Sequence, residues 1–206
     1  MNHQITYAFR LVHIQNIPHV LQYGFVHKDS VYADPNYVPI GDAAIIRVRS
    51  SRQLNGRYSV GDYIPFYFGP RSPMLFVIQH GYNGVKQYNP EELVYCVIKL
   101  EDIVSSTIDC VFTDGHALYF ITKLYDKSRL KDVNQIISYE DVYTANWVNE
   151  DDRDLKRRKE AELLLKDELP SQFIKGFVVY NNKACEKLQS YGVQPSQIAI
   201  RPSYYF

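Results

Sequence analysis

Three polar side chains stand beside apolar runs in the sequence and could take part in chemistry. Arg10 interrupts the stretch AFRLV, Glu162 precedes LLL, and His116 follows FTDG. A partly desolvated glutamate has a raised pKa and can polarise a hydroxyl group or assist a proton transfer. An arginine on a mostly buried strand can pair with a carboxylate or a phosphate. Together these residues indicate a site for an anionic, ring-bearing ligand, although their spacing does not name it.

Each of these residues also has a purely structural explanation. Arg10 can extend its charged end into solvent, and Glu162 can lie on the exposed face of a charged helix, because fully buried arginine and glutamate are rare. A single histidine such as His116 is weaker evidence still. From the residues alone, both explanations stay open.

Motifs for several other chemistries are absent from the sequence. It contains neither G-x-x-x-x-G-K-[ST] nor G-x-G-x-x-G, and neither H-E-x-x-H nor G-x-S-x-G. The six histidines show no metal-ligand spacing, and Cys96, Cys110 and Cys185 lie outside any C-x-x-C pattern. We therefore expect no metal site and three reduced thiols.

Periodicity and capping residues predict the elements that would position these side chains. Strands are expected at 5–14, 62–69, 93–100, 109–115, 117–121, 173–181 and 197–206. Helices are expected at 16–24, 71–81, 125–138, 149–170 and 182–192. Residues 43–53 fit a strand or a helix, and 27–42 a long loop of the kind that often carries function. The pattern is that of an α+β domain with six or seven strands.

Length, composition and charge fit one domain that spans residues 1–206. Hydrophobic residues make up 46% of the chain, as in ordinary globular proteins. The 23 basic residues balance 23 acidic ones, so only a local patch could attract a nucleic acid. No basic leader segment and no membrane-length apolar run is present, which makes the cytoplasm the expected location.

The segment GDYIPFYFGPRSPMLF (61–76) resembles the D-Y-V-P-F-Y-F-x-P-R-S-P-M-L block of the DarT family, the toxins of DarT-DarG toxin-antitoxin systems. Further blocks resemble the family's in the same order: HIQNI (13–17), IIRVR (45–49), VFTDGHA (111–117) and KEAELLL (159–165). The resemblance spans nearly the whole chain. It implies a single-domain ADP-ribosyltransferase-like fold, with central mixed or antiparallel sheets flanked by helices.

The resemblance also implies an activity, the transfer of ADP-ribose from NAD to a base in single-stranded DNA without a metal. Glu162 then corresponds to the catalytic glutamate, which orients the NAD ribose and assists deprotonation of the base. Arg49 corresponds to the catalytic arginine, which stabilises developing negative charge, and His116 to a histidine that supports the site. The neighbouring Arg47, Arg52 and Arg57 are expected on a solvated basic face.

The same resemblance assigns the binding residues. Tyr67 is expected to stack against nicotinamide or line its pocket, and Arg10, His13 and Asn16 to grip NAD. The expected DNA contacts are Arg71 and Lys156. Expected partners are single-stranded DNA and a cognate macrodomain antitoxin, and the chain is expected to be a monomer.

One departure from the family pattern concerns Arg10. Many thymidine-modifying members have Y-H-I-T where this chain has FRLV, so an arginine replaces the histidine. This difference favours guanine slightly over thymine as the modified base. Two alternatives remain open: a related enzyme that hydrolyses NAD or modifies RNA or protein, and a catalytically silent nucleotide-binding module.

Overall fold

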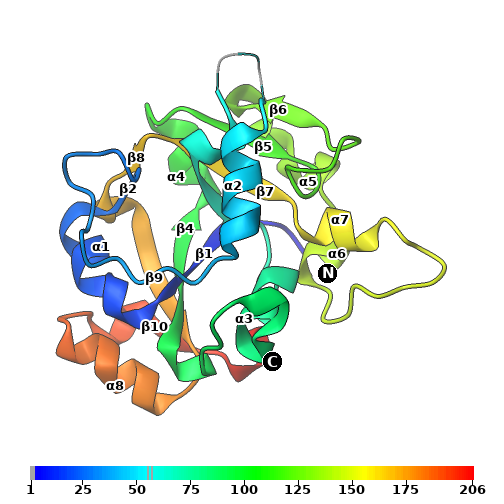
Figure 1. Ribbon diagram of the computed structural model, residues 1–206. Helices are drawn as coiled ribbons and strands as arrows, with labels where there is room; N and C mark the ends of the chain where they lie inside the picture. Colours follow the sequence, from blue (N-terminus) through cyan, green and yellow to red (C-terminus); the bar gives the residue numbers. More distant parts are fainter. Residues whose placement is uncertain (1–2, 55, 57) are drawn as a thin grey trace.

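The computed structural model describes residues 3–54, 56 and 58–206, so the predicted basic-face residue Arg57 lies outside the described residues. Its main feature is an eight-stranded mixed sheet (Figure 1). In spatial order the strands are β10 (Ile198–Ile200), β9 (Ile174–Val179), β4 (Leu93–Lys99), β1 (Tyr7–His13), β3 (Tyr63–Tyr67), β7 (Glu162–Lys166), β5 (Cys110–Thr113) and β6 (Leu124–Asp126). Neighbouring strands are antiparallel except β9 and β10, which are parallel.

A two-stranded sheet and several helices surround the main sheet. The small sheet pairs β2 (Phe25–Val26) with β8 (Glu168–Leu169). The helices are α1 (Ile17–Tyr23), α2 (Ala43–Ser51), α3 (Pro73–His80), α4 (Leu100–Ser105), α5 (Val133–Ile136), α6 (Tyr139–Tyr143), α7 (Leu155–Lys159) and α8 (Asn182–Ser190). Figure 1 shows α1 and α8 toward one side of the molecule and α6 with α7 toward the other. No described helix is long and apolar enough to cross a membrane.

Alternating burial along the strands shows that the main sheet is covered on both faces. In β4, Val94, Cys96 and Ile98 belong to one buried cluster, while Leu93 and Tyr95 belong to another. Successive side chains of a strand point to opposite faces, so the two clusters lie on opposite sides of the sheet. The continuous apolar run in this strand is therefore explained by burial on both sides.

Capping residues fix the helices that flank the site. Ser72 accepts a hydrogen bond from the N–H of Leu75 at the start of α3, which ends at Gly81 in the left-handed conformation (φ 66°). Both ends were predicted from sequence. Asp42 accepts hydrogen bonds from the N–H groups of Ala44 and Ile45, so the ambiguous segment 43–53 is mainly the helix α2.

Several predicted elements are wrong. The expected strand 117–121 consists of turns, and the expected helix 149–170 contains only the short α7 before the chain enters β7. Leu163, Leu164 and Leu165 are fully buried between β3 and β5, so sheet pairing overrides the helical charge pattern. The sheets contain ten described strands rather than six or seven, because short strands such as β2 and β8 carry almost no sequence signal.

Candidate active site

The main sheet and α2 bring Glu162 and Arg49 together. Glu162 is the first residue of β7, opposite Tyr67 of β3, and Arg49 lies in the last turn of α2. Nη2 of Arg49 lies 2.8 Å from Oε2 of Glu162, and Nη1 donates a hydrogen bond of 3.2 Å to Oε1. The Glu162 side chain is fully buried and that of Arg49 is 13% exposed. The structure therefore joins two predicted catalytic residues in one buried ion pair.

Both members of this pair are held in their charged forms. Burial acts to raise the pKa of Glu162, but the nearby guanidinium of Arg49, the His116 ring and the Ala117 N–H outweigh it and leave that pKa below its usual value. For Arg49, burial lowers the pKa and the Glu162 carboxylate raises it, with a net increase. The sequence-based expectation of a raised pKa for Glu162 was wrong, because it considered desolvation without the arginine partner.

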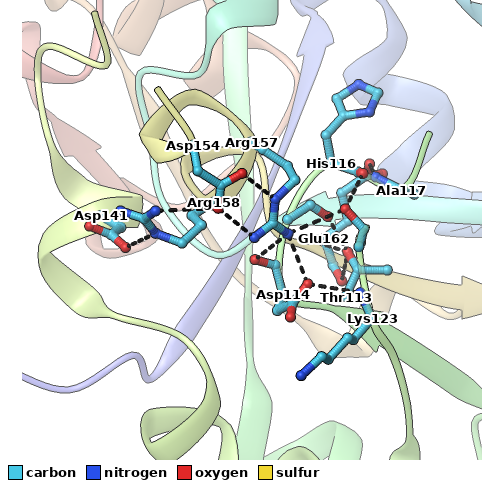
Figure 2. Close-up of polar contacts among 12 residues, drawn as sticks. Thr113, Asp114, His116, Ala117, Lys123, Asp141, Asp154, Arg157, Arg158 and Glu162 are labelled. Carbon is cyan, nitrogen blue, oxygen red and sulfur yellow. Dashed lines mark hydrogen bonds and ion pairs between the residues drawn. The ribbon is translucent and has the colours of Figure 1, made fainter. Parts of the chain in front are cut away.

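The loop that follows β5 is bonded directly to Glu162. The Glu162 N–H donates to Oγ1 of Thr113 at 3.1 Å, and the Ala117 N–H donates to Oε1 of Glu162 at 3.1 Å. The His116 N–H donates to the carbonyl of Arg157 at 2.9 Å. These hydrogen bonds hold the backbone of His116 and Ala117 next to Glu162 and α7 (Figure 2).

Arg157 ties this loop to α7. Its Nε and Nη2 lie 2.7 and 2.8 Å from the two carboxylate oxygens of Asp154, and its Nη1 lies 3.0 Å from Oδ1 of Asp114 (Figure 2). A Cβ atom at Gly115 would lie 2.3 Å from Nη1 of Arg157 and 2.9 Å from its carbonyl oxygen. Glycine at position 115 therefore makes room for the arginine that anchors the loop.

A cavity of about 520 Å³ lies beside the ion pair. Five of the residues predicted for the site line it: Arg10, Arg49, Tyr67, His116 and Lys156. The remaining lining is largely apolar and includes Ile45, Ile46 and Met74. Glu162 itself is not among the lining residues, whereas its ion-pair partner Arg49 is.

Arg10 is held at the cavity wall and has no carboxylate partner among the described residues. Its Nη1 donates to the carbonyl of Pro65 at 2.9 Å, and its guanidinium lies 5.2 Å from the centroid of the Phe25 ring. Its Nε is buried and has no hydrogen-bond partner among the described residues. This arginine is therefore available to pair with an anionic ligand in the cavity.

His13 and Asn16 are not among the residues that line the cavity, and their contact with NAD stays a prediction. Both are buried, and the Asn16 amide exchanges two 2.9 Å hydrogen bonds with the backbone of Val38. The ring of His13 lies 4.9 Å from that of Tyr88, whose hydroxyl donates to the carbonyl of Pro39 at 3.3 Å. Asn16 and the His13–Tyr88 pair thus hold residues 37–42, the loop that forms one wall of the cavity.

The two predicted DNA contacts separate in space. Lys156 lines the cavity, whereas Arg71 packs its guanidinium 4.4 Å from the centroid of the Phe206 ring. The Arg71 N–H donates to the hydroxyl of Tyr95 at 2.9 Å. Arg71 thus joins the segment before α3 to the end of the chain and does not contribute to the cavity wall.

Sequence reasoning missed Glu160, which lines the cavity and is 5% exposed. Its Oε2 lies 3.4 Å from Nζ of Lys156, and burial raises its pKa. The available signal was the Glu-Ala-Glu sequence, which places a second carboxylate two residues before the predicted catalytic Glu162. The two glutamates do not share one side, because Glu160 ends α7 with a non-extended backbone (φ −96°, ψ 27°) and lines the cavity, whereas Glu162 does not. Among residues 3–54, 56 and 58–206, no group of three or more His, Cys, Asp and Glu side chains could hold a metal ion.

A second cavity of about 660 Å³ adjoins the first across the loop 37–42. Its lining includes the exposed Arg47 of α2, together with Lys86 and Tyr88. Of the arginines expected on a solvated basic face, Arg47 is exposed and Arg52 is half-buried. The loop therefore forms part of the wall of both cavities.

Comparison with known proteins gives consistent matches over the whole chain. A family model described as "ssDNA thymidine ADP-ribosyltransferase, DarT" matches residues 9–206. A DNA ADP-ribosyl transferase of Escherichia coli O127:H6 is 29% identical over 220 residues, covering 100% of this chain and 96% of that protein. A fusion of DNA ADP-ribosyl transferase with DNA ADP-ribosyl glycohydrolase from Thermosipho africanus is 28% identical over 182 residues, 88% of this chain and 44% of the fusion.

Solved structures show the same fold. Thermus sp. 2.9 DarT in complex with ADP-ribosylated single-stranded DNA superposes with a TM-score of 0.83 at 24% identity, covering 100% of both chains. The same protein in complex with NAD+ superposes with a TM-score of 0.79 at 23% identity, again over 100% of both chains. Thermosipho africanus DarTG in complex with ADP-ribose superposes with a TM-score of 0.80 at 25% identity, over 98% of this chain and 51% of that chain.

Proposed function

The chain belongs to the DarT family of single-stranded DNA ADP-ribosyltransferases, and we propose that it transfers ADP-ribose from NAD+ to a base of single-stranded DNA. The observation that carries this proposal is the buried Glu162–Arg49 ion pair beside a cavity with Arg10 and Tyr67 in its wall. The related Thermus protein has been solved with NAD+ and with ADP-ribosylated single-stranded DNA, which supports both substrates.

The residues of the cavity fit NAD+. Its volume of about 520 Å³ lies in the range of small-molecule sites. The guanidinium of Arg10 lines the cavity, has no carboxylate partner among the described residues and suits a phosphate or ribose oxygen. The Tyr67 ring offers an aromatic surface for nicotinamide, and burial raises the pKa of its hydroxyl, which keeps the ring neutral.

The proposed reaction breaks the bond between nicotinamide and ribose and joins the ribose to a base, which loses a proton. Positive charge develops on the ribose, so an ionised carboxylate in a water-poor site stabilises the transition state. The lowered pKa of Glu162 keeps it ionised for that role. Because Glu162 is not among the residues that line the cavity, the Arg49 side chain must move before the carboxylate accepts a hydrogen bond from a ribose hydroxyl. Arg49 holds the carboxylate in place and stabilises negative charge that develops nearby.

Mutation of Glu162 tests the catalytic assignment. Glu162→Ala would leave a buried arginine without its partner, so the isosteric Glu162→Gln is the better variant. We expect transfer to fall by about 10²- to 10³-fold, as for loss of one stabilising group in a transition state. Labelled NAD+ and a broad set of single-stranded oligonucleotides give the rate, and thermal unfolding checks the fold.

The exposed Glu186 of α8 provides a matched control, and Glu186→Gln should keep the wild-type rate. Full activity of Glu162→Gln would contradict the assignment. Wild-type protein that labels no oligonucleotide would overturn the DNA-directed activity. Nicotinamide release that does not depend on DNA would favour an NAD-hydrolysing enzyme, and tight binding of NAD+ without turnover would favour a silent binding module.

The identity of the modified base is a separate proposal. Arg10, which lines the cavity, stands where many thymidine-modifying members carry a histidine, and this difference supports guanine. The description of the matching family model names thymidine. Mass spectrometry of one modified oligonucleotide that contains all four bases distinguishes the two, and modification at thymine would overturn the choice of guanine.

We propose that a macrodomain antitoxin is the natural partner and removes the modification. The Thermosipho relative, in which a transferase is fused to a DNA ADP-ribosyl glycohydrolase, supports this pairing. We further propose that residues 1–206 act as one domain and as a monomer in the cytoplasm, where NAD+ and DNA are both present. Light scattering after size exclusion tests the oligomeric state.

A further inference from the structure

The loop between β5 and β6 exposes large apolar side chains. Tyr119 is 44% exposed, Phe120 89% and Ile121 62%. They follow one another in the chain and form what we call the YFI loop tip, residues 119–121. Contiguous exposed apolar surface of this kind marks interaction sites, because leaving it in water is unfavourable.

The ends of this loop are firmly anchored. The Tyr119 N–H and the Thr122 hydroxyl both donate to the carbonyl of His116, at 3.1 and 2.9 Å. The Lys123 N–H donates to Oδ1 of Asp114 at 2.9 Å, and Asp114 in turn pairs with Arg157 (Figure 2). The YFI loop tip is therefore presented outward by a well-bonded frame, as binding loops usually are.

The loop is continuous with the candidate active site. Ala117, two residues before the tip, donates its N–H to Glu162, and His116 lines the cavity with Lys156 and Glu160. The ring of Tyr119 lies 5.7 Å from that of His116 in an edge-on arrangement. A nucleic-acid strand that delivers a base to this part of the cavity lies close to the tip.

We propose that the YFI loop tip is a stacking platform for the nucleotides that flank the modified base. This inference rests on the proposed function, since it assumes single-stranded DNA as acceptor. Bases of a single strand stack on aromatic side chains with little sequence preference, while nearby lysines contact the phosphates. Phe120 supplies the exposed ring, and the exposed Lys123 and half-exposed Lys156 supply the positive charge.

The test measures the KM for the acceptor oligonucleotide separately from the KM for NAD+. Phe120→Ala should raise the oligonucleotide KM by about tenfold, the size expected when one stacked base is lost. The KM for NAD+ should not change, because Phe120 does not line the cavity. Phe120→Trp, which keeps an aromatic ring, should restore the oligonucleotide KM.

A matched control is Val31→Ala, because Val31 is 93% exposed but lies in the loop before α2. An unchanged oligonucleotide KM in Phe120→Ala, or an equal increase in Val31→Ala, would overturn the proposal. So would normal DNA modification combined with lost binding of the purified antitoxin, which would assign the tip to a protein partner. If wild-type protein modifies no oligonucleotide, the proposed function itself fails, and that outcome is distinct from these.

Discussion

At the scale of single residues, the site contains two buried carboxylates with opposite pKa shifts. Glu162 is ion-paired with Arg49 and has a lowered pKa. Burial raises the pKa of Glu160, which His116 and Lys156 lower only in part. Groups with separated pKa values can hold different protonation states at one pH. The pair thus combines a firmly ionised carboxylate with one that takes up a proton more readily.

We predict that Glu160→Gln stabilises the protein at neutral pH. The unfolded-state pKa is near 4.5 and the folded-state pKa is higher. The stability contributed by Glu160 is therefore present below 4.5 and lost as the pH rises through the folded-state pKa. Urea unfolding should give a higher free energy of unfolding for the variant than for wild type at a pH above the folded-state pKa, and no difference below pH 4.5. The lost contact with half-exposed Lys156 costs little, because exposed ion pairs contribute little to stability.

The exposed Glu186→Gln variant controls for the change of charge and should show no gain at either pH. If Glu160→Gln is less stable than wild type at neutral pH, its ion pair with Lys156 outweighs the cost of burial. That result would reverse our account of this carboxylate.

The residues of the site could be predicted from sequence only in part. Glu162 and His116 stand out beside apolar runs, but Arg49 is singled out only by resemblance to DarT proteins. The sign of the Glu162 pKa shift depends on the distance to Arg49, 113 positions away in the chain. That distance cannot be inferred from the residues that neighbour Glu162 in the sequence.

At the scale of elements, Lys159 links three segments around the site. It is 1% exposed and ends α7, and its Nζ donates to the carbonyls of Pro70 and Val142, at 2.8 and 2.6 Å. These carbonyls belong to the segment before α3 and to α6. Burial, with a contribution from Arg71, lowers the pKa of Lys159 to about 7. The start of β7 is thereby fixed against two other elements.

We predict that Lys159→Met destabilises the protein by about 2 kcal/mol or more, because two buried carbonyls lose their donor. Between the folded-state pKa of about 7 and the unfolded-state value of 10.5, the unfolded chain binds more protons. The contribution of Lys159 to the free energy of unfolding is therefore fully present above pH 10.5 and is lost as the pH falls through 7. Urea unfolding should show that the free energy of unfolding of wild type exceeds that of the variant by an amount that grows from pH 7 to pH 9.

Lys187→Met on the exposed face of α8 serves as the control, since this lysine has no buried carbonyl partner among the described contacts. A Lys159→Met variant as stable as wild type, or a difference in stability that does not depend on pH, would show that the hydrogen bonds from Lys159 to the two carbonyls do not stabilise the protein.

Element boundaries were predictable where local chemistry determines them. The Ser72 cap and Gly81 define α3 from sequence, as their hydrogen bond and backbone angle confirm. The prediction of one helix over residues 149–170 is wrong, because residues 162–166 form β7 and pair with β3 and β5. Sheet pairing joins residues far apart in the chain, and a local charge pattern does not contain it.

At the scale of the whole molecule, zero net charge constrains how single-stranded DNA is bound. The chain has 23 basic and 23 acidic residues, so the overall field does not attract a polyanion. Among the described residues, the exposed lysines that could contact phosphates are Lys28 and Lys156 in the cavity wall and Lys123 in the loop after β5. Affinity for DNA should therefore depend on a few local phosphate contacts together with base stacking.

We predict a shallow salt dependence of DNA binding. For single strands, the slope of log affinity against log salt is about −0.7 per phosphate contact, so three contacts give a slope of about −2. Fluorescence anisotropy of a labelled oligonucleotide across a salt series measures it. Lys123→Gln and Lys156→Gln should each reduce the slope by about 0.7, while Lys187→Gln on α8 should leave it unchanged. A much steeper wild-type slope would mean that the strand crosses a wider basic surface, with Arg47 and Lys86 beside the second cavity as the next candidates.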